Sequence, residues 1–184
     1  MQNYTPGQKV GILGYMAFKT TLEKKIWEWI RAEKPSYAFN TVLPATVIGA
    51  TLSPENQGIQ SSCVMVKWLR DGVNLDVVAS VVAQRFVDTQ DLGVLYVAAL
   101  VTPGVNGERL FGFGNRFSFP KVGEILQELE PEKEIPKLRE DGWDQTEVPN
   151  QRSESLVRAC VGHGWAALED TIADCLNSIK KLEG

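Results

Sequence analysis

The chain has few of the residues on which metal and disulfide chemistry depend. Its 184 residues include one histidine, His163, and three cysteines, which are Cys63, Cys160 and Cys175. Histidine is a frequent zinc ligand, so a metal site built on histidines is not expected. The cysteines are odd in number and form no C-x-x-C pair. This pattern favours reduced thiols in the cytoplasm over a disulfide framework.

Long apolar runs and strong charge asymmetry are also lacking. No apolar stretch is long enough to span a bilayer and no signal peptide is recognisable, so we expect a cytoplasmic protein without a membrane partner. The net charge is −4 and no basic stripe is present. Nucleic acid is therefore not expected as a partner. A hydrophobic content of 43% and a charged content of 23% are typical of one soluble globular domain.

A tyrosine and a lysine stand four residues apart at the start of an amphipathic segment. Tyr15 and Lys19 begin the segment 15–33, in which apolar residues recur at helical spacing. On a helix the two side chains lie on one face, about one turn apart. A nearby cation favours phenolate over phenol, so such a pair can give or take a proton near neutral pH. The alternative is an ordinary solvated contact between residues i and i+4.

The remaining pattern predicts alternating helices and strands. Helices are expected at 62–71 and 119–129, and a further helix is expected to follow a cap at Thr89 or Asp91 and to run through Leu100. A last helix is expected within 156–182, preceded by Gly162-His163-Gly164-Trp165. A buried parallel strand is expected at 38–43 and another strand at 108–113. The segments 44–60 and 131–151 are expected to be loops, the second of them exposed. The segment 77–86 is compatible with either helix or strand.

Several segments follow the Tyr15 helix in a characteristic order. They are Asn40-Thr-Val-Leu-Pro44-Ala-Thr-Val-Ile-Gly49, then Phe86-Val-Asp88-Thr-Gln-Asp91-Leu, then Ala98-Ala-Leu, then Gly107-Glu108-Arg109. This series resembles the extended short-chain dehydrogenase/reductases, in the group of the fungal aldehyde and ketone reductases and dihydroflavonol reductase. The resemblance extends from residue 14 to about residue 179.

The resemblance implies a fold class and a division of the chain. The class is α/β, with a truncated Rossmann-like fold: an incomplete parallel sheet with flanking helices plus a small C-terminal substrate-type lobe. We expect one truncated domain over 1–184, with the Rossmann-like part at 14–106 and the lobe mostly at 107–184.

The dinucleotide-binding half of such reductases has no counterpart in this sequence. In the family, a Gly-rich turn before the Tyr-x-x-x-Lys helix holds the cofactor pyrophosphate. Here Gly11-Ile-Leu-Gly14 lacks the G-x-G-x-x-G spacing. The resemblance thus implies NADP or NAD as the cofactor, and the missing turn predicts that this chain binds it weakly or not at all.

The resemblance also implies the site residues. Tyr15 and Lys19 would be catalytic, and together with Pro44 and Val47 they would contact the nicotinamide end of the cofactor. The substrate would be a small carbonyl compound, as in fungal secondary metabolism. Two alternatives stay open: a cofactor-independent isomerase, dehydratase or cyclase that uses the same pair, and a non-catalytic binding or oligomerisation module. A homo-oligomer or a partner chain is expected on the helix that carries Trp27, Trp29 and Ile30.

Four further residues have a functional and a structural interpretation. Asp88 and Asp91 are compatible with catalytic carboxylates, but a capping role at a strand-to-helix turn is favoured. His163 is compatible with acid–base catalysis, but its glycine neighbours favour a loop residue. Cys63 stands near the start of an expected helix, where a thiol can be activated, but a buried small apolar residue is favoured.

Overall fold

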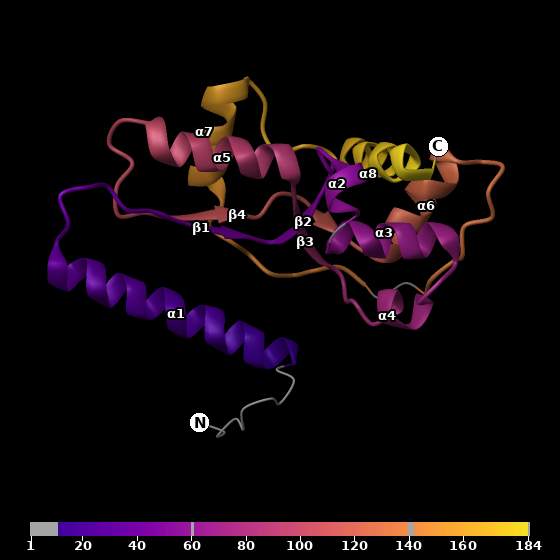
Figure 1. Cartoon of the computed structure of the whole chain (residues 1–184), viewed down its shortest axis with the longest axis horizontal. Helices are drawn as coiled ribbons and strands as arrows, with labels where there is room; N and C mark the ends of the chain where they lie inside the picture. The colour runs from indigo at the N-terminus through magenta and orange to yellow at the C-terminus, as the bar shows by residue number, and fades with distance from the viewer. Residues whose placement is uncertain (1–10, 60, 140–141, 184) are drawn as a thin grey trace. The chain divides into compact units, whose positions relative to one another are not determined.

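The computed structural model describes residues 11–59, 61–139 and 142–183, and the chain divides into two compact units (Figure 1). The division falls between Phe39 and Asn40. Each unit is described by itself below.

The first unit is built around one long helix. Helix α1 spans Ile12–Glu33, so the expected helix is confirmed and begins three residues earlier than predicted. It ends because Lys34 adopts a left-handed conformation and Pro35 follows, which disfavours continued helix. None of the residues of α1 is buried. Trp27 packs edge-on against Phe39, with ring centroids 5.2 Å apart.

The second unit contains two small sheets. Strand β1 (Thr41–Pro44) runs parallel to β4 (Arg109–Gly112). Strand β2 (Thr46–Ile48) runs parallel to β3 (Gln84–Asp88), which pairs antiparallel with β5 (Arg116–Phe117). These parallel pairs confirm the α/β class and the incomplete parallel sheet.

The strand expected at 38–43 needs a correction. It begins at Thr41, and its residues are half-buried or exposed rather than buried. Within the described residues β1 has β4 as its one neighbour, so its other edge has no strand beside it. A strand that is paired on both sides would be covered more fully.

Seven helices of the second unit are described. They are α2 (Pro54–Gln57), α3 (Ser62–Asp71), α4 (Leu75–Ala79), α5 (Thr89–Val101), α6 (Phe119–Leu129), α7 (Gln151–Val161) and α8 (Leu168–Glu183). The bounds predicted for α3 and α6 are confirmed. The prediction of a loop at 44–60 is wrong in part, because this segment contains β2 and α2. The ambiguous segment 77–86 contains the end of α4 and the start of β3.

The last predicted helix, expected after 162–165, is confirmed as α8, and a separate helix that was not predicted, α7, precedes that segment. Helix α7 ends at Gly162, whose φ of 85° is a left-handed conformation that glycine adopts readily. Helix α8 begins six residues later. The cap of α5 is also corrected: the side chain of Asp88, rather than of Thr89 or Asp91, accepts the Gln90 amide at 2.7 Å.

The core of this unit has two clusters of buried side chains. The larger one gathers residues from β2, β3, β5, α3, α6 and α8, and the smaller one gathers residues from α5, β4 and α7. Phe117 stands between Phe86 and Phe119, with edge-to-face centroid distances of 5.9 and 5.6 Å. Ile135 is also buried in the larger cluster, so the segment 131–151 is not uniformly exposed as predicted.

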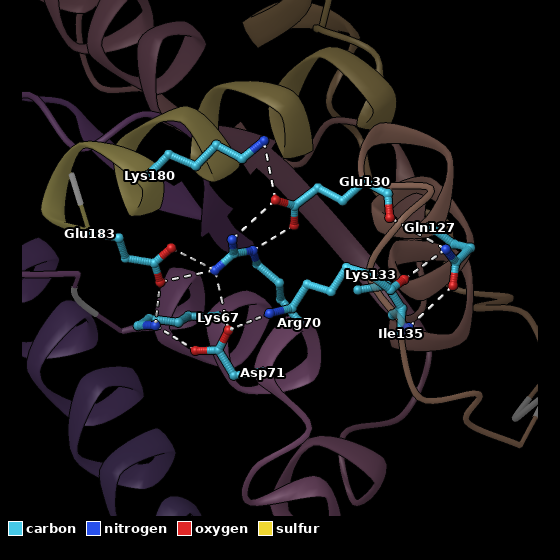
Figure 2. A network of polar contacts seen from close by, with 9 residues as sticks. All are labelled: Lys67, Arg70, Asp71, Gln127, Glu130, Lys133, Ile135, Lys180 and Glu183. Atoms are coloured by element: carbon cyan, nitrogen blue, oxygen red, sulfur yellow. Dashed lines mark hydrogen bonds and ion pairs between the residues drawn. The ribbon is translucent and has the colours of Figure 1, made fainter.

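A network of charged side chains joins α3 to α8 and to the end of α6 (Figure 2). The Arg70 guanidinium donates to both carboxylate oxygens of Glu130, at 2.6 and 3.0 Å, and to Glu183 at 2.9 Å. Lys180 contacts Glu130 at 3.2 Å. The hydrogen bond from Arg70 lowers the pKa of Glu130 to about 2. Bidentate pairs of this kind fix geometry as well as charge.

Candidate functional site

Helix α1 carries the first predicted pair. The Tyr15 amide donates to the Gly11 carbonyl at 3.1 Å, so Tyr15 lies within the first turn. The Tyr15 side chain is 55% exposed, and Lys19 is exposed one turn later. Both side chains are therefore accessible on one helical face of the first unit. A phenol beside an ammonium can donate a proton to a carbonyl oxygen, and this role stays a prediction.

The second predicted pair lies where the chain passes from one sheet to the other. Pro44 ends β1 and is exposed, and the Ala45 amide still donates to Gly112 at 2.9 Å. Thr46 then begins β2, and Val47 is half-buried beside Val87 of β3. Ligands of open α/β sheets commonly bind beyond the carboxyl ends of strands, which is where Pro44 lies.

The two pairs belong to different units. Tyr15 and Lys19 lie in the first unit, and Pro44 and Val47 lie in the second. Each pair is accessible within its own unit, and their joint role in binding a nicotinamide stays a prediction.

Gly49 and Asp88 lie close together at a buried polar contact, which accounts for the residue type at both positions. A side chain at Gly49 would place its Cβ 2.8 Å from Asp88 Oδ2, and the φ of 144° also disfavours other residues. Oδ2 accepts the Thr171 hydroxyl at 3.0 Å, while Oδ1 accepts the Gln90 amide. With both oxygens bonded, Asp88 caps α5 and holds α8, which supports its structural interpretation.

Asp91 and His163 also have structural positions. Asp91 is 4% exposed and accepts the Ala166 amide at 2.7 Å. Burial raises the pKa of Asp91, and this hydrogen bond opposes the rise. His163 is exposed after α7, with Nδ1 at 2.9 Å from the Gly164 carbonyl oxygen. Its placement in a loop is confirmed.

The cysteines differ in exposure. Cys63 and Cys175 are buried, and Cys160 is exposed. The Cys63 thiol donates to the Gly49 carbonyl at 3.4 Å. A hydrogen bond with Cys63, together with burial, raises the pKa of the Cys175 thiol well above its usual range. The prediction that Cys63 is a buried small residue is confirmed.

One further concave region lies apart from the predicted residues. A cavity of about 610 Å3 lies between the 50–52 loop, Gln90 and the side of α8 that bears Asp174 and Lys181. Neither Pro44 nor Val47 lines it. Over the described parts of the chain, no group of three or more His, Cys, Asp or Glu side chains is arranged to hold a metal ion. Likewise, none of the described helices combines the length and apolar character needed to cross a bilayer.

Comparison with curated proteins identifies reductases. The chain is 28% identical over 165 residues to Aldehyde reductase 2 of Sporidiobolus salmonicolor, a match that covers 89% of this chain and 48% of the reductase. It is 33% identical over 159 residues to Ketoreductase adrE of Penicillium rubens, covering 84% of this chain and 46% of that protein. No family model matches the sequence.

Solved structures show the same fold. Gre2 from Candida albicans aligns with a TM-score of 0.75 at 17% identity, over 95% of this chain and 54% of that one. The yeast methylglyoxal/isovaleraldehyde reductase Gre2, solved with NADPH, aligns with a TM-score of 0.68 at 22% identity, over 88% of this chain and 53% of that one.

These matches agree with the resemblance seen in the sequence. The chain spans about half the length of the curated relatives it matches, which fits the expectation that it corresponds to one half of such a reductase. The relatives named include an aldehyde reductase, ketoreductases and NAD-dependent epimerase/dehydratases. Over most of its length the chain is therefore similar to about half of known aldehyde reductases and ketoreductases, in agreement with the resemblance to the extended short-chain dehydrogenase/reductases.

Proposed function

We propose that this chain supplies the proton-transfer helix and the substrate-side part of a nicotinamide-dependent reductase of small carbonyl compounds. The observation that carries the proposal is the Tyr15–Lys19 pair, which is accessible on one face of α1 in a chain related to aldehyde reductases and ketoreductases. The comparisons favour neither the cofactor-independent enzyme nor the non-catalytic module.

Each residue of the pair has a separate task. The Tyr15 hydroxyl donates a proton to the carbonyl oxygen as negative charge develops there. The Lys19 ammonium, one turn away, stabilises the phenolate that remains after the transfer. Lys19 also offers hydrogen-bond donors to a ribose hydroxyl at the nicotinamide end.

The available groups fit only one end of the cofactor. Tyr15 and Lys19 offer polar donors, while Val47 offers an apolar surface suited to a nicotinamide ring. NADP or NAD would supply the hydride for carbonyl reduction. The first turn of α1 follows Gly11 without a glycine-rich cradle for a pyrophosphate. We therefore propose weak or no NADPH binding by this chain alone, which calorimetry tests. A micromolar dissociation constant would contradict it.

The decisive experiment measures NADPH oxidation with a panel of aldehydes and ketones. The chain is assayed alone and together with a separately expressed dinucleotide-binding half of the Penicillium rubens ketoreductase. We expect turnover only in the mixture. Tyr15→Phe should lower the rate about 100- to 10,000-fold, because the proton donor is lost. Tyr37→Phe is the matched control, since Tyr37 is 57% exposed in the same unit but lies outside α1.

A second variant separates proton transfer from simple binding. Lys19→Met should lower the rate and move its pH optimum upward, because the cation that favours phenolate is gone. Lys24→Met on the same helix should change neither. Turnover that is unaffected by Tyr15→Phe would show that the pair does not act in catalysis.

We also propose that α1 mediates self-association or docking. Several of its apolar side chains are more than half exposed, among them Ile12, Phe18 and Trp29. Burial of such surface is favourable by about 25 cal/mol per Å2, and a two-fold homodimer is the simplest closed arrangement. Trp27 is a weaker candidate because Phe39 already covers it. Sedimentation that shows a monomer at high concentration would contradict this proposal.

A further inference from the structure

Two arginines face each other directly across the antiparallel pair β3–β5. Arg85 and Arg116 are register partners. The register is held by backbone hydrogen bonds on the next residues, from Phe86 to the Asn115 carbonyl at 2.9 Å and from Gly114 to the Phe86 carbonyl at 2.8 Å. The side chains of residues directly opposite each other in an antiparallel pair project to the same face of the sheet. Like charges placed directly opposite each other are unfavourable, so this arrangement calls for a compensating group.

Neutral backbone groups take up the hydrogen bonds of Arg85. Its guanidinium donates to the Thr146 carbonyl at 3.1 and 3.3 Å and to the Gly114 carbonyl at 3.0 Å. These contacts hold the guanidinium in place without cancelling its charge. By contrast, Arg70, Arg152 and Arg158 each bind a carboxylate.

Arg116 has an unsatisfied donor. Its Nε is buried and has no hydrogen-bond partner within the described residues. A buried donor that lacks a partner costs free energy, and an arriving acceptor recovers it. Among the described residues, Asp144 interacts electrostatically with both arginines, and its Oδ1 accepts the Thr146 amide at 2.8 Å. Both guanidinium groups therefore act on the Asp144 carboxylate.

The strand register relates these arginines to Val47. Side chains alternate between the two faces of a strand. Ile48, Phe86 and Phe117 project into the larger core cluster. Val87 and its partner Val47 therefore lie on the opposite face, as do Arg85, two residues before Val87, and Arg116. Arg85 and Val87 are separated by roughly 7 Å along the strand, and neighbouring strands by about 5 Å.

We infer that Arg85 and Arg116 bind a carboxylate on the substrate, so that the compound reduced is an oxo acid rather than a neutral aldehyde or ketone. This inference rests on the proposed function, which places the nicotinamide end at Val47. An anion within about 10 Å of that point matches a small molecule that carries a carbonyl and a carboxylate a few bonds apart. The planar guanidinium fork suits carboxylates in particular, and the buried Nε of Arg116 gains the acceptor that it lacks.

Binding, measured without any cofactor, tests the inference. Straight-chain oxo acids of about five to eight carbons and their methyl esters are titrated into the full chain and followed by NMR. We expect at least one acid to bind about tenfold more tightly than its ester, as is typical of a charge-assisted contact. Added salt should weaken binding of that acid and leave its ester unchanged.

Arg116→Gln is the first variant, because Arg116 Nε holds no other group in place and the fold should survive. It should abolish the preference for the acid, and Arg116→Lys should restore part of it. Arg158→Gln, which removes an exposed pair with Glu154, is the matched control and should keep the preference. Arg85→Gln should also abolish it, with circular dichroism to check that the fold survives the loss of its contacts to Gly114 and Thr146.

Each of the other possible results overturns either the anion site or the proposed function. The inference is overturned if no acid binds more tightly than its ester, if no probe binds, or if the preference survives Arg116→Gln. A preference for acids without any carbonyl reduction would refute the proposed function and keep the anion site. Reduction of neutral ketones without that preference would refute only the anion site.

Discussion

The two units of the chain differ in how their side chains are covered. Helix α1 has no buried residue, whereas the second unit encloses Ile48, Phe86, Phe117 and Ile172 almost completely. The proposed proton donor lies on the first unit, and the anion-binding arginines lie on the second. The comparison teaches that the proposed proton donor lies outside the buried core that stabilises the second unit. Substitutions matched between the units can therefore separate stability from chemistry.

The largest expected effect on stability comes from one aromatic residue of the core. Phe117→Ala should lower the free energy of unfolding by about 3–5 kcal/mol, because it empties the space between Phe86 and Phe119. Phe18→Ala in α1 should change it by less than about 0.5 kcal/mol, since Phe18 is 62% exposed. Urea unfolding measures both. Equal losses of unfolding free energy in the two variants would contradict the difference in burial between the units.

The next effect comes from the charge network. Arg70→Met should cost about 3 kcal/mol, because it leaves the Glu130 carboxylate, 13% exposed, without its bidentate partner. Arg31→Met, at an exposed position of α1, should cost less than about 0.5 kcal/mol. A stable Arg70→Met protein would show that the hydrocarbon replaces the ion pairs without loss, as happens in some proteins.

A smaller effect depends on pH. The pKa of Glu130 is lowered to about 2 in the folded protein, mainly by its hydrogen bond with Arg70, from an ordinary value of 4.5. A lowered carboxyl pKa stabilises the fold above the ordinary value, and this stability is lost as the pH falls toward 2. The deficit of Glu130→Gln relative to the natural chain should be largest near pH 7 and shrink below pH 4. Glu33→Gln, at an exposed position of α1, should show little pH dependence. A Glu130→Gln deficit that stays constant with pH would disprove the linkage.

The smallest effect concerns thiol accessibility and leaves stability unchanged. A disulfide reagent should label one thiol quickly, since only Cys160 among the three cysteines is exposed. Cys160→Ser should remove this fast phase, while Cys63 and Cys175 react only when the protein unfolds. Two fast thiols in the natural chain would indicate that the region around Gly49 opens readily.

Local chemistry explains which elements are predictable. The bounds of α3 follow from helical spacing that ends at Gly72, and those of α6 from Ser118, whose hydroxyl accepts the Lys121 amide at 3.3 Å. Strand β2 was missed because its three residues gain their partners from β3, about forty residues away. The separate helix α7 was missed in part because its polar first turn carries little apolar periodicity.

The sequence by itself determined the resemblance to the reductases and the spacing of the Tyr15–Lys19 pair, because these depend on residue identity at short spacing. Only the tertiary structure decided that both Asp88 oxygens are bonded, that Arg70 joins three elements, and that Arg85 faces Arg116. Such contacts join residues far apart in the chain, and they depend on strand register and helix packing. A one-residue shift in register would move Arg85 to the other face of the sheet.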